Sequence, residues 1–124
     1  MPTSRLTGTR ILLVEDDSLV GLDLEQMLMG AGCEVVGPLS SVAAAVACLG
    51  IDVVDGALLD VNLGREPVYP VADLLRQRGV PYVFLTGYGS DILPDAHRDR
   101  PVILKPFEPR QVLMALALSM RHPD

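Results

Sequence analysis

Short apolar runs that each stop at a polar residue divide this chain. The runs 11–14, 57–59, 82–85 and 102–104 are followed directly by Glu15, Asp60, Thr86 and Lys105. Runs of this length and composition are typical of strands that are buried on both faces of a parallel sheet. Ligands of such sheets bind beyond the carboxyl ends of the strands. The pattern therefore predicts that carboxylates, a hydroxyl and an ammonium group gather at one edge of a sheet.

Helical periodicity, capping residues and glycines predict helices between these runs. The predicted strands are 10–14, 33–36, 53–59, 80 or 82–85 and 102–104, and the predicted helices are 17 or 18–29, 41–49, 71–78 and 109–120. Gly37-Pro38 is expected to end the second strand, residues 62–70 to form a loop, and 87–100 to make a poor helix. Alternating strands and helices imply right-handed crossovers and a doubly wound α/β fold with helices on both faces of a five-stranded parallel sheet.

Composition narrows the class of protein. The 124 residues suit one domain, 1–124, in which residues 1–9 look like a loose leader and no residues remain for an output domain. Apolar residues make up 49% and the net charge is −6, which argues against disorder and against direct nucleic-acid binding. The chain has no signal segment and no apolar stretch of about 18 residues, so a soluble cytoplasmic protein without membrane contact is expected. Cys33 and Cys48 have no metal-ligand spacing and are expected to be free thiols.

Two adjacent carboxylates, Glu15 and Asp16, follow the first predicted strand. Such groups repel each other and lose solvation unless a cation compensates them. Mg²⁺ prefers oxygen ligands and is often held by one or two carboxylates, and Asp60 could supply a third. The alternative is that these acids cap the following helix, which is the favoured interpretation for Asp17 but not for the pair.

Asp60 could also act as a nucleophile, because a carboxylate can attack an activated phosphorus to form an acyl phosphate. The Thr86 hydroxyl and the Lys105 ammonium would then neutralise phosphoryl oxygens. Taken alone, Thr86 is more simply a strand-end hydroxyl bonded to backbone, and Lys105 a side chain that extends to water. Lys105 is, however, the only lysine beside nine arginines, and a compact ammonium suits a tight phosphate site.

In order and spacing, four motifs resemble the receiver domain of two-component response regulators over about residues 10–120. They are Ile11-Leu12-Leu13-Val14-Glu15-Asp16-Asp17, Leu58-Leu59-Asp60-Val61-Asn62-Leu63, Phe84-Leu85-Thr86-Gly87 and Val102-Ile103-Leu104-Lys105-Pro106-Phe107. The resemblance implies a flavodoxin-like sheet with strand order 2-1-3-4-5. It also implies a cis peptide bond between Lys105 and Pro106, and at Gly87 a small residue that leaves space for a phosphoryl group.

The resemblance further implies the roles of the site residues. Asp60 would accept a phosphoryl group from a sensor histidine kinase or a histidine phosphotransfer protein. Mg²⁺ would be held by Glu15, Asp16, Asp60 and the main-chain carbonyl of Asn62. Thr86 and Lys105 would bind the phosphoryl oxygens.

Two departures from the usual receiver pattern make the chain similar to the single-domain subgroup that is named for its Phe-x-Thr-Gly-Tyr signature. Val102 stands where ordinary receivers carry a switching aromatic residue, and residues 89–100 match the usual fourth helix poorly. Tyr88 is a candidate replacement for the missing aromatic, as a sensor or a gate. The alternative is an aromatic side chain that merely covers a wet loop.

The last predicted helix is apolar on more than one side. Leu113, Leu116, Ala117 and Met120 share one face and are expected to form its core stripe, and Val112, Met114 and Leu118 lie outside it. These extra apolar positions predict either a docking or homodimer surface or a helix that packs more deeply. His97 and His122 lie outside any catalytic or metal spacing and are expected to be solvated.

The sequence thus predicts a stand-alone signalling domain that is phosphorylated on Asp60 with Mg²⁺ and acts through protein partners. It would be consumed as a substrate and is not expected to be an enzyme in the turnover sense. One alternative is an interaction module of the same fold that works without phosphorylation. A Mg²⁺-dependent phosphatase is disfavoured, because Asn62 stands where an acid/base aspartate would be expected two residues after Asp60.

Overall fold

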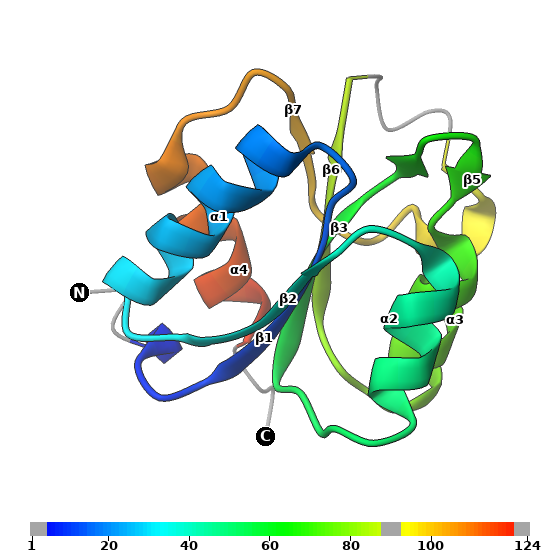
Figure 1. Ribbon diagram of the computed structural model, residues 1–124, viewed down its shortest axis with the longest axis horizontal. Helices are drawn as coiled ribbons and strands as arrows, with labels where there is room; N and C mark the ends of the chain where they lie inside the picture. Colours follow the sequence, from blue (N-terminus) through cyan, green and yellow to red (C-terminus); the bar gives the residue numbers. More distant parts are fainter. Residues whose placement is uncertain (1–4, 88–92, 121–124) are drawn as a thin grey trace.

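A parallel five-stranded sheet with two helices on each face forms the centre of the computed structural model, which describes residues 5–87 and 93–120 (Figure 1). The strand order is β2-β1-β3-β6-β7, which corresponds to the expected order 2-1-3-4-5 and confirms the predicted fold class. The strands of the sheet are β1 (Arg10–Val14), β2 (Glu34–Leu39), β3 (Gly56–Asp60), β6 (Tyr82–Thr86) and β7 (Val102–Leu104). The helices are α1 (Ser18–Gly30), α2 (Val42–Leu49), α3 (Tyr69–Gln77) and α4 (Pro109–Ser119).

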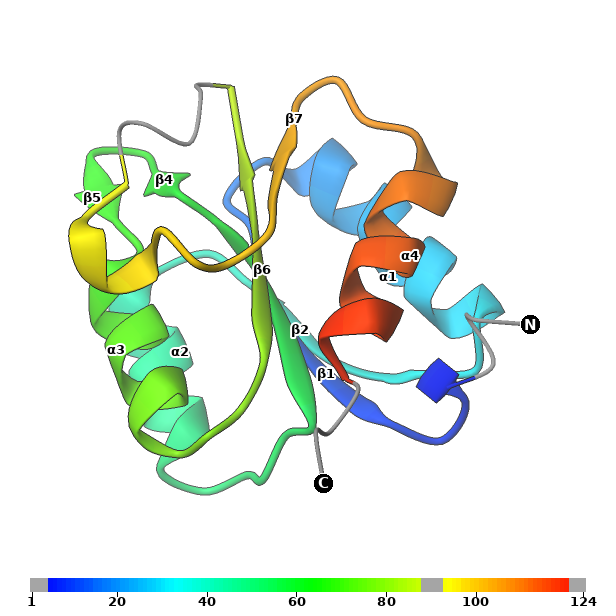
Figure 2. The same ribbon diagram turned by 180° about the vertical axis from the view of Figure 1, so that it is seen from behind.

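Two apolar clusters fill the space between the sheet and its helices. Helices α1 and α4 cover one face, and α2 and α3 cover the other (Figures 1 and 2). Side chains alternate between the two clusters along each strand, so that Leu58 packs toward α1 and α4 whereas Leu59 packs toward α2 and α3. Every residue of β3 and of β6 is buried, as the short apolar runs predicted.

Helix boundaries follow the capping chemistry of the sequence. The Asp17 carboxylate accepts hydrogen bonds from the amides of Leu19 and Val20 at the start of α1. The Ser41 hydroxyl accepts one from the amide of Ala44 at the start of α2. Both caps satisfy amides that have no partner inside the helix, so these two predicted helix starts are confirmed.

Several predicted boundaries in the first half of the chain are wrong. Strand β2 continues through Gly37-Pro38, a cis peptide bond, to Leu39, with a register irregularity opposite Leu12 and Val14. Strand β3 begins only at Gly56, where an added Cβ would lie 2.9 Å from the Met120 sulfur. The predicted loop 62–70 contains a small ladder of β4 (Asn62–Leu63) and β5 (Glu66–Pro67), after which α3 already begins at Tyr69.

Three burial predictions also need correction. Residues 5–9 are not a loose leader, because Leu6 is fully buried in the cluster under α1 and α4. On α4 the fully buried positions are Val112, Leu116 and Ala117, whereas Leu113 is only partly buried. Only Leu118 of the extra apolar positions is exposed. His97 is not solvated: it is 1% exposed in a short 3₁₀ helix, η3 (Asp95–His97).

The cysteines and the lengths of the helices can be compared with two further expectations. Neither cysteine forms a disulfide. Among the helices of the described ranges, none combines the length and the apolar character that crossing a membrane requires. His122 and Tyr88 lie outside the described residues.

Gly37 provides a test of the β1–β2 pairing. Its φ of 125° is unfavourable for other residues, and an added Cβ would collide with the Leu13 carbonyl oxygen. Gly37→Ala should therefore lower the free energy of unfolding by about 2 kcal/mol or more, measured by urea denaturation. Gly30→Ala is the matched control, because no atom in the described part of the chain lies within 4 Å of its added Cβ, and it should be neutral or stabilising. Equal effects of the two substitutions would contradict the role given to Gly37.

Candidate functional site

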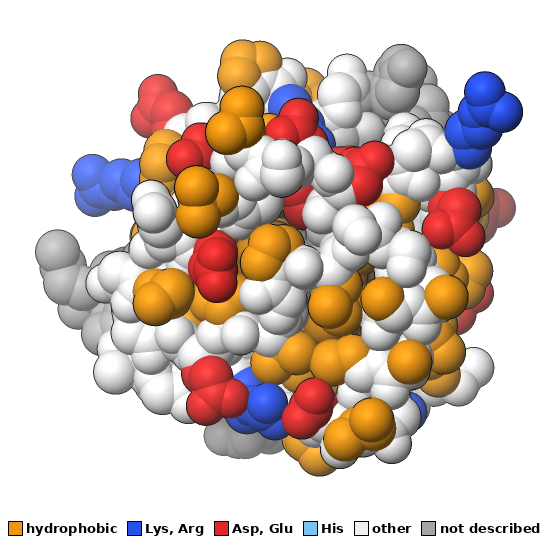
Figure 3. Space-filling view, viewed as in Figure 1, with side chains coloured by type: hydrophobic (Ala, Val, Ile, Leu, Met, Phe, Trp, Pro, Cys, Tyr) orange, Lys and Arg blue, Asp and Glu red, His pale blue; other side chains and the backbone are white. Residues whose placement is uncertain are grey.

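Polar residues from four strands meet at the side of the sheet where the carboxyl ends of the strands lie. Glu15 and Asp16 follow β1, Asp60 ends β3, Thr86 ends β6 and Lys105 follows β7. The carboxyl ends of these strands lie at the upper edge in Figure 1, where Figure 3 shows acidic side chains in red. The predicted convergence at one edge is thus present in the structure.

The acidic side chains form one compact cluster. One carboxylate oxygen each from Glu15, Asp16 and Asp60 lies within 4.8 Å of the others. Glu15 and Asp60 are only 3% and 6% exposed, whereas Asp16 is exposed to solvent. Two buried carboxylates at this separation require a compensating charge.

Lys105 supplies part of that charge. Its Nζ atom donates hydrogen bonds to Asp60 Oδ2 at 3.0 Å and to Glu15 Oε1 at 3.1 Å. Burial alone would lower the pKa of Lys105, but the bonds to Asp60 and Glu15 outweigh burial and raise it. Lys105 is therefore held as an ammonium ion between the two buried carboxylates.

One ammonium does not balance three carboxylates. Burial, followed by the hydrogen bond and charge of Asp60, raises the pKa of Glu15 to about 7, although Lys105 and the Asp17 amide act in the opposite direction. The Asp17 amide donates to Glu15 Oε2 at 3.2 Å. The site therefore retains an excess of negative charge at neutral pH.

The described residues fit Mg²⁺ by the chemistry of their donors. Glu15, Asp16 and Asp60 offer hard oxygen ligands, and the exposed position of Asp16 leaves the cluster accessible to water, which Mg²⁺ retains in protein sites. Asn62 is also exposed nearby, and its amide donates to Asp60 Oδ1 at 3.4 Å. Gly64, with a φ of 62° in the β4–β5 turn, lies close to Asp16: an added Cβ would be 3.7 Å from Asp16 Oδ2.

Backbone pairing links Thr86 to Lys105. The amide of Lys105 donates to the Thr86 carbonyl oxygen at 2.8 Å, and Thr86 pairs with Leu104 in the β6–β7 ladder. Thr86 is 1% exposed, and Leu85 beside it pairs with Asp60 in the β3–β6 ladder. No atom of the described residues lies within 4 Å of a Cβ added at Gly87. The expected cis peptide bond between Lys105 and Pro106 is present.

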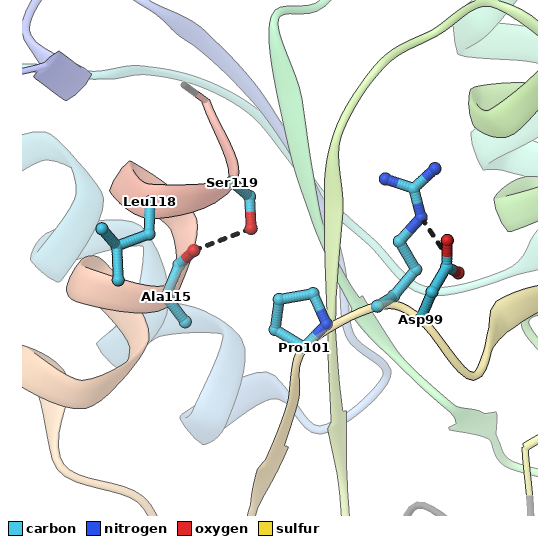
Figure 4. Close-up of a pocket in the computed structure, with 6 residues that line it drawn as sticks. Asp99, Pro101, Ala115, Leu118 and Ser119 are labelled. Atoms are coloured by element: carbon cyan, nitrogen blue, oxygen red, sulfur yellow. Dashed lines mark hydrogen bonds and ion pairs between the residues drawn. The ribbon is translucent and has the colours of Figure 1, made fainter. Parts of the chain in front are cut away.

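One pocket lies beside the polar site, and a second lies elsewhere on the surface. One of about 410 Å³ lies beside Lys105 and is lined by Val20, Asp23, Pro106 and Phe107. The other, of about 460 Å³, lies between α4 and the segment that enters β7, away from the acidic cluster (Figure 4). Its lining includes Pro101 and the half-exposed Leu118. The second pocket is therefore a surface feature and not part of the polar site.

The chain resembles known proteins in sequence and in structure. The phyllosphere-induced regulator PhyR of Methylorubrum extorquens is 32% identical over 118 residues, which cover 91% of this chain and 44% of that protein. The chain spans about half the length of the curated relatives that it matches. A search against models of protein families finds no match.

Solved structures match this chain over most of both chains. The solution structure of SdrG from Sphingomonas melonis Fr1 is 40% identical, covers 91% of this chain and 96% of that chain, and has a TM-score of 0.79. A response regulator receiver protein from Sinorhizobium medicae WSM419 is 28% identical, covers 93% and 96% of the two chains, and also has a TM-score of 0.79. With its fold and its acidic edge, the chain therefore belongs to the receiver domain family of response regulators.

Proposed function

We propose that this chain is a single receiver domain that accepts a phosphoryl group on Asp60 from the phosphohistidine of a sensor kinase or a phosphotransfer protein. The observation that carries the proposal is the position of the Lys105 amine, which contacts both Asp60 and Glu15 inside the acidic cluster. Ordinary structural roles do not require a cluster of three carboxylates, two of them bound to one ammonium, at the ends of buried strands. A phosphoryl-transfer site does, because its main task is to position and neutralise charged oxygens.

Each residue has a task in this reaction. An Asp60 oxygen would form a bond to phosphorus while the bond from phosphorus to the donor imidazole nitrogen breaks, and the imidazole leaves with the electron pair. The flexible Lys105 stem would let its ammonium follow the transferred oxygens, with the Thr86 hydroxyl on another oxygen. Glu15, Asp16, Asp60 and the Asn62 carbonyl are the proposed Mg²⁺ ligands, and the ion when bound supplies positive charge at the phosphoryl group.

Output through proteins is the second part of the proposal. Asp60 is a phosphoacceptor that is consumed in each cycle, so the domain signals and does not turn over a substrate. It would act in the cytoplasm, where its donor kinase presents the phosphohistidine. The pocket beside Lys105 offers the donor a concave surface, and the α4 pocket with Leu118 offers a downstream protein or a second copy another (Figure 4).

A receiver fold that binds partners without phosphorylation is the competing function. That function gives Lys105 no role at Asp60, whereas phosphorylation on Asp60 requires both residues. A phosphatase is disfavoured by Asn62, whose side chain cannot act as a general acid.

Phosphorylation can be measured directly by intact-protein mass spectrometry after incubation with acetyl phosphate and Mg²⁺. The chain should gain the mass of one phosphoryl group, and Asp60→Asn should gain none. Lys105→Ala should slow the reaction by roughly 10²-fold, because it removes the cation that neutralises the transferred oxygens. If the unaltered chain gains no mass with acetyl phosphate or with phosphorylated kinase, the competing function stands. Turnover of phosphoesters would indicate the phosphatase.

Mg²⁺ binding should depend on Asp16 more than on its neighbour Asp17. Asp16→Asn should weaken Mg²⁺ binding about tenfold or more in isothermal titration calorimetry, since it removes a charged ligand from an exposed position. Asp17→Asn is the matched control: the same change one residue away keeps an oxygen that can cap α1. Its Mg²⁺ affinity should stay within about twofold of the unaltered chain. Equal losses in both variants would indicate a general effect of negative charge and no ligand role for Asp16.

The proposed docking surface can be tested at Leu118. Leu118→Asp should reduce self-association in sedimentation velocity, or binding of the purified downstream protein, by about tenfold. Met29→Asp is the control, because Met29 is an equally exposed apolar residue on α1, 59% against 51% exposed. Unchanged association in Leu118→Asp would remove α4 as the docking surface.

A further inference from the structure

His97 forms a buried hydrogen-bonded bridge that the phosphoryl-transfer site does not use. Its Nδ1 lies 2.7 Å from the Tyr82 hydroxyl oxygen, and its Nε2 lies 2.7 Å from Asp73 Oδ1. The ionised Asp73 carboxylate can only accept, so Nε2 carries a hydrogen. In the neutral ring, Nδ1 then accepts from the Tyr82 hydroxyl. Both ring nitrogens are thus satisfied, and three elements, α3, β6 and η3, are tied together.

Ring packing holds the same bridge in place. The His97 ring stacks on Tyr69 with 5.8 Å between centroids and 12° between planes. The rings of Tyr82 and Phe84 meet it edge to face. The Arg100 guanidinium lies 4.4 Å above the centre of the Tyr82 ring. Residues 97–100 are therefore fixed against β6 and α3 by an aromatic cluster and not by surface charges alone.

The position of β7 depends on how this segment is fixed. Strand β7 has three residues, lies at the edge of the sheet and, among the strands that the structure describes, pairs only with β6 (Figure 2). Just before it, the Phe84 amide donates to the Pro101 carbonyl oxygen at 3.0 Å. Lys105 comes directly after it. A short edge strand with one neighbour has little pairing energy of its own, so its anchored flanks decide where Lys105 is placed.

We propose that His97 is a positioning residue: its bridge to Asp73 and Tyr82 acts as a latch that holds β7 in the register bringing Lys105 to Asp60. The expected effect on the phosphorylation rate rests on the proposed function, but the placement of Lys105 can be measured without phosphorylation. The latch does not position the backbone that carries the proposed Mg²⁺ ligands, because Glu15 and Asp16 follow β1 and Asp60 ends β3, two strands that each have neighbours on both sides. Loss of the latch should therefore lower the phosphorylation rate but leave the Mg²⁺ affinity nearly unchanged.

Asp73 is the suitable residue to change, because its side chain is 60% exposed and its removal leaves the core intact. Asp73→Ala removes the acceptor for Nε2–H, whereas Asp73→Asn retains an oxygen acceptor. Tyr82→Phe removes the other end of the bridge and keeps the ring. Asp95→Ala is the control: it removes a carboxylate from the same segment whose ion pair, to Arg98, is exposed.

Hydrogen exchange of the Lys105 amide, which donates to Thr86, reports the latch in the full chain. In Asp73→Ala and Tyr82→Phe this exchange should quicken about five- to tenfold relative to amides of β1, as expected for the loss of one hydrogen bond. The rate of phosphorylation by acetyl phosphate should fall by a similar factor, while the Mg²⁺ dissociation constant stays within about twofold. Asp73→Asn should recover most of both losses, and Asp95→Ala should show neither.

Unchanged exchange at Lys105 in both bridge variants would overturn the latch. So would a fall in Mg²⁺ affinity as large as the fall in rate, because that indicates general destabilisation. If the unaltered chain is not phosphorylated at all while Lys105 exchange responds as expected, the proposed function fails and the latch remains.

Discussion

The ammonium of Lys105 between two buried carboxylates is the interaction on which the rest of this structure depends. Glu15 and Asp60 could not both remain charged at 3% and 6% exposure without a cation close by. That cation comes from the far end of the chain, 45 residues after Asp60 and 90 after Glu15. The parallel sheet makes the contact possible, because it delivers the carboxyl ends of distant strands to one edge.

The charge of the site bears on the proposed binding of Mg²⁺ and of a phosphoryl group. With all three carboxylates ionised, the cluster and its one ammonium carry two negative charges in excess, and burial and Asp60, which raise the pKa of Glu15 to about 7, oppose that state. One divalent cation would cancel the excess. Lys105 would then be free to leave the carboxylates for a phosphoryl group, since its flexible stem allows the ammonium to move without moving β7.

The sequence predicted the parts of the fold that regular patterns encode. Apolar runs ending at Asp60, Thr86 and Lys105 located the strand ends and hence the site, and the Asp17 and Ser41 caps located two helix starts. The second half of strand β2 escaped prediction because Gly37-Pro38 normally ends a strand, whereas an edge strand tolerates a proline whose missing amide faces away from the sheet.

His97 could not have been placed from the sequence. It lies in a polar segment without periodicity, and its partners Tyr82 and Asp73 are 15 and 24 residues away. Similarly, one face of α4 could not be distinguished from the next, because apolar residues occupy both, and only tertiary packing shows that Val112 is buried and Leu118 is not. Leu6 was missed because a single apolar residue among polar neighbours gives no pattern.

Strand β7 carries a valine and no aromatic side chain, and this limits how the strand can change when the site changes. Val102 of β7 pairs with Phe84 of β6 and packs at the margin of the core, where its branched side chain has little rotameric freedom. The rings of Tyr69 on α3 and of Tyr82 and Phe84 on β6 lie instead around His97. A ring on β7 could swing between core and solvent while the strand stayed still, but a valine cannot. A change at Asp60 that reaches β7 by a route other than the Lys105 side chain must therefore move the β7 backbone or the residues that anchor it, and under the proposed latch the anchor at His97 sets how readily it does so.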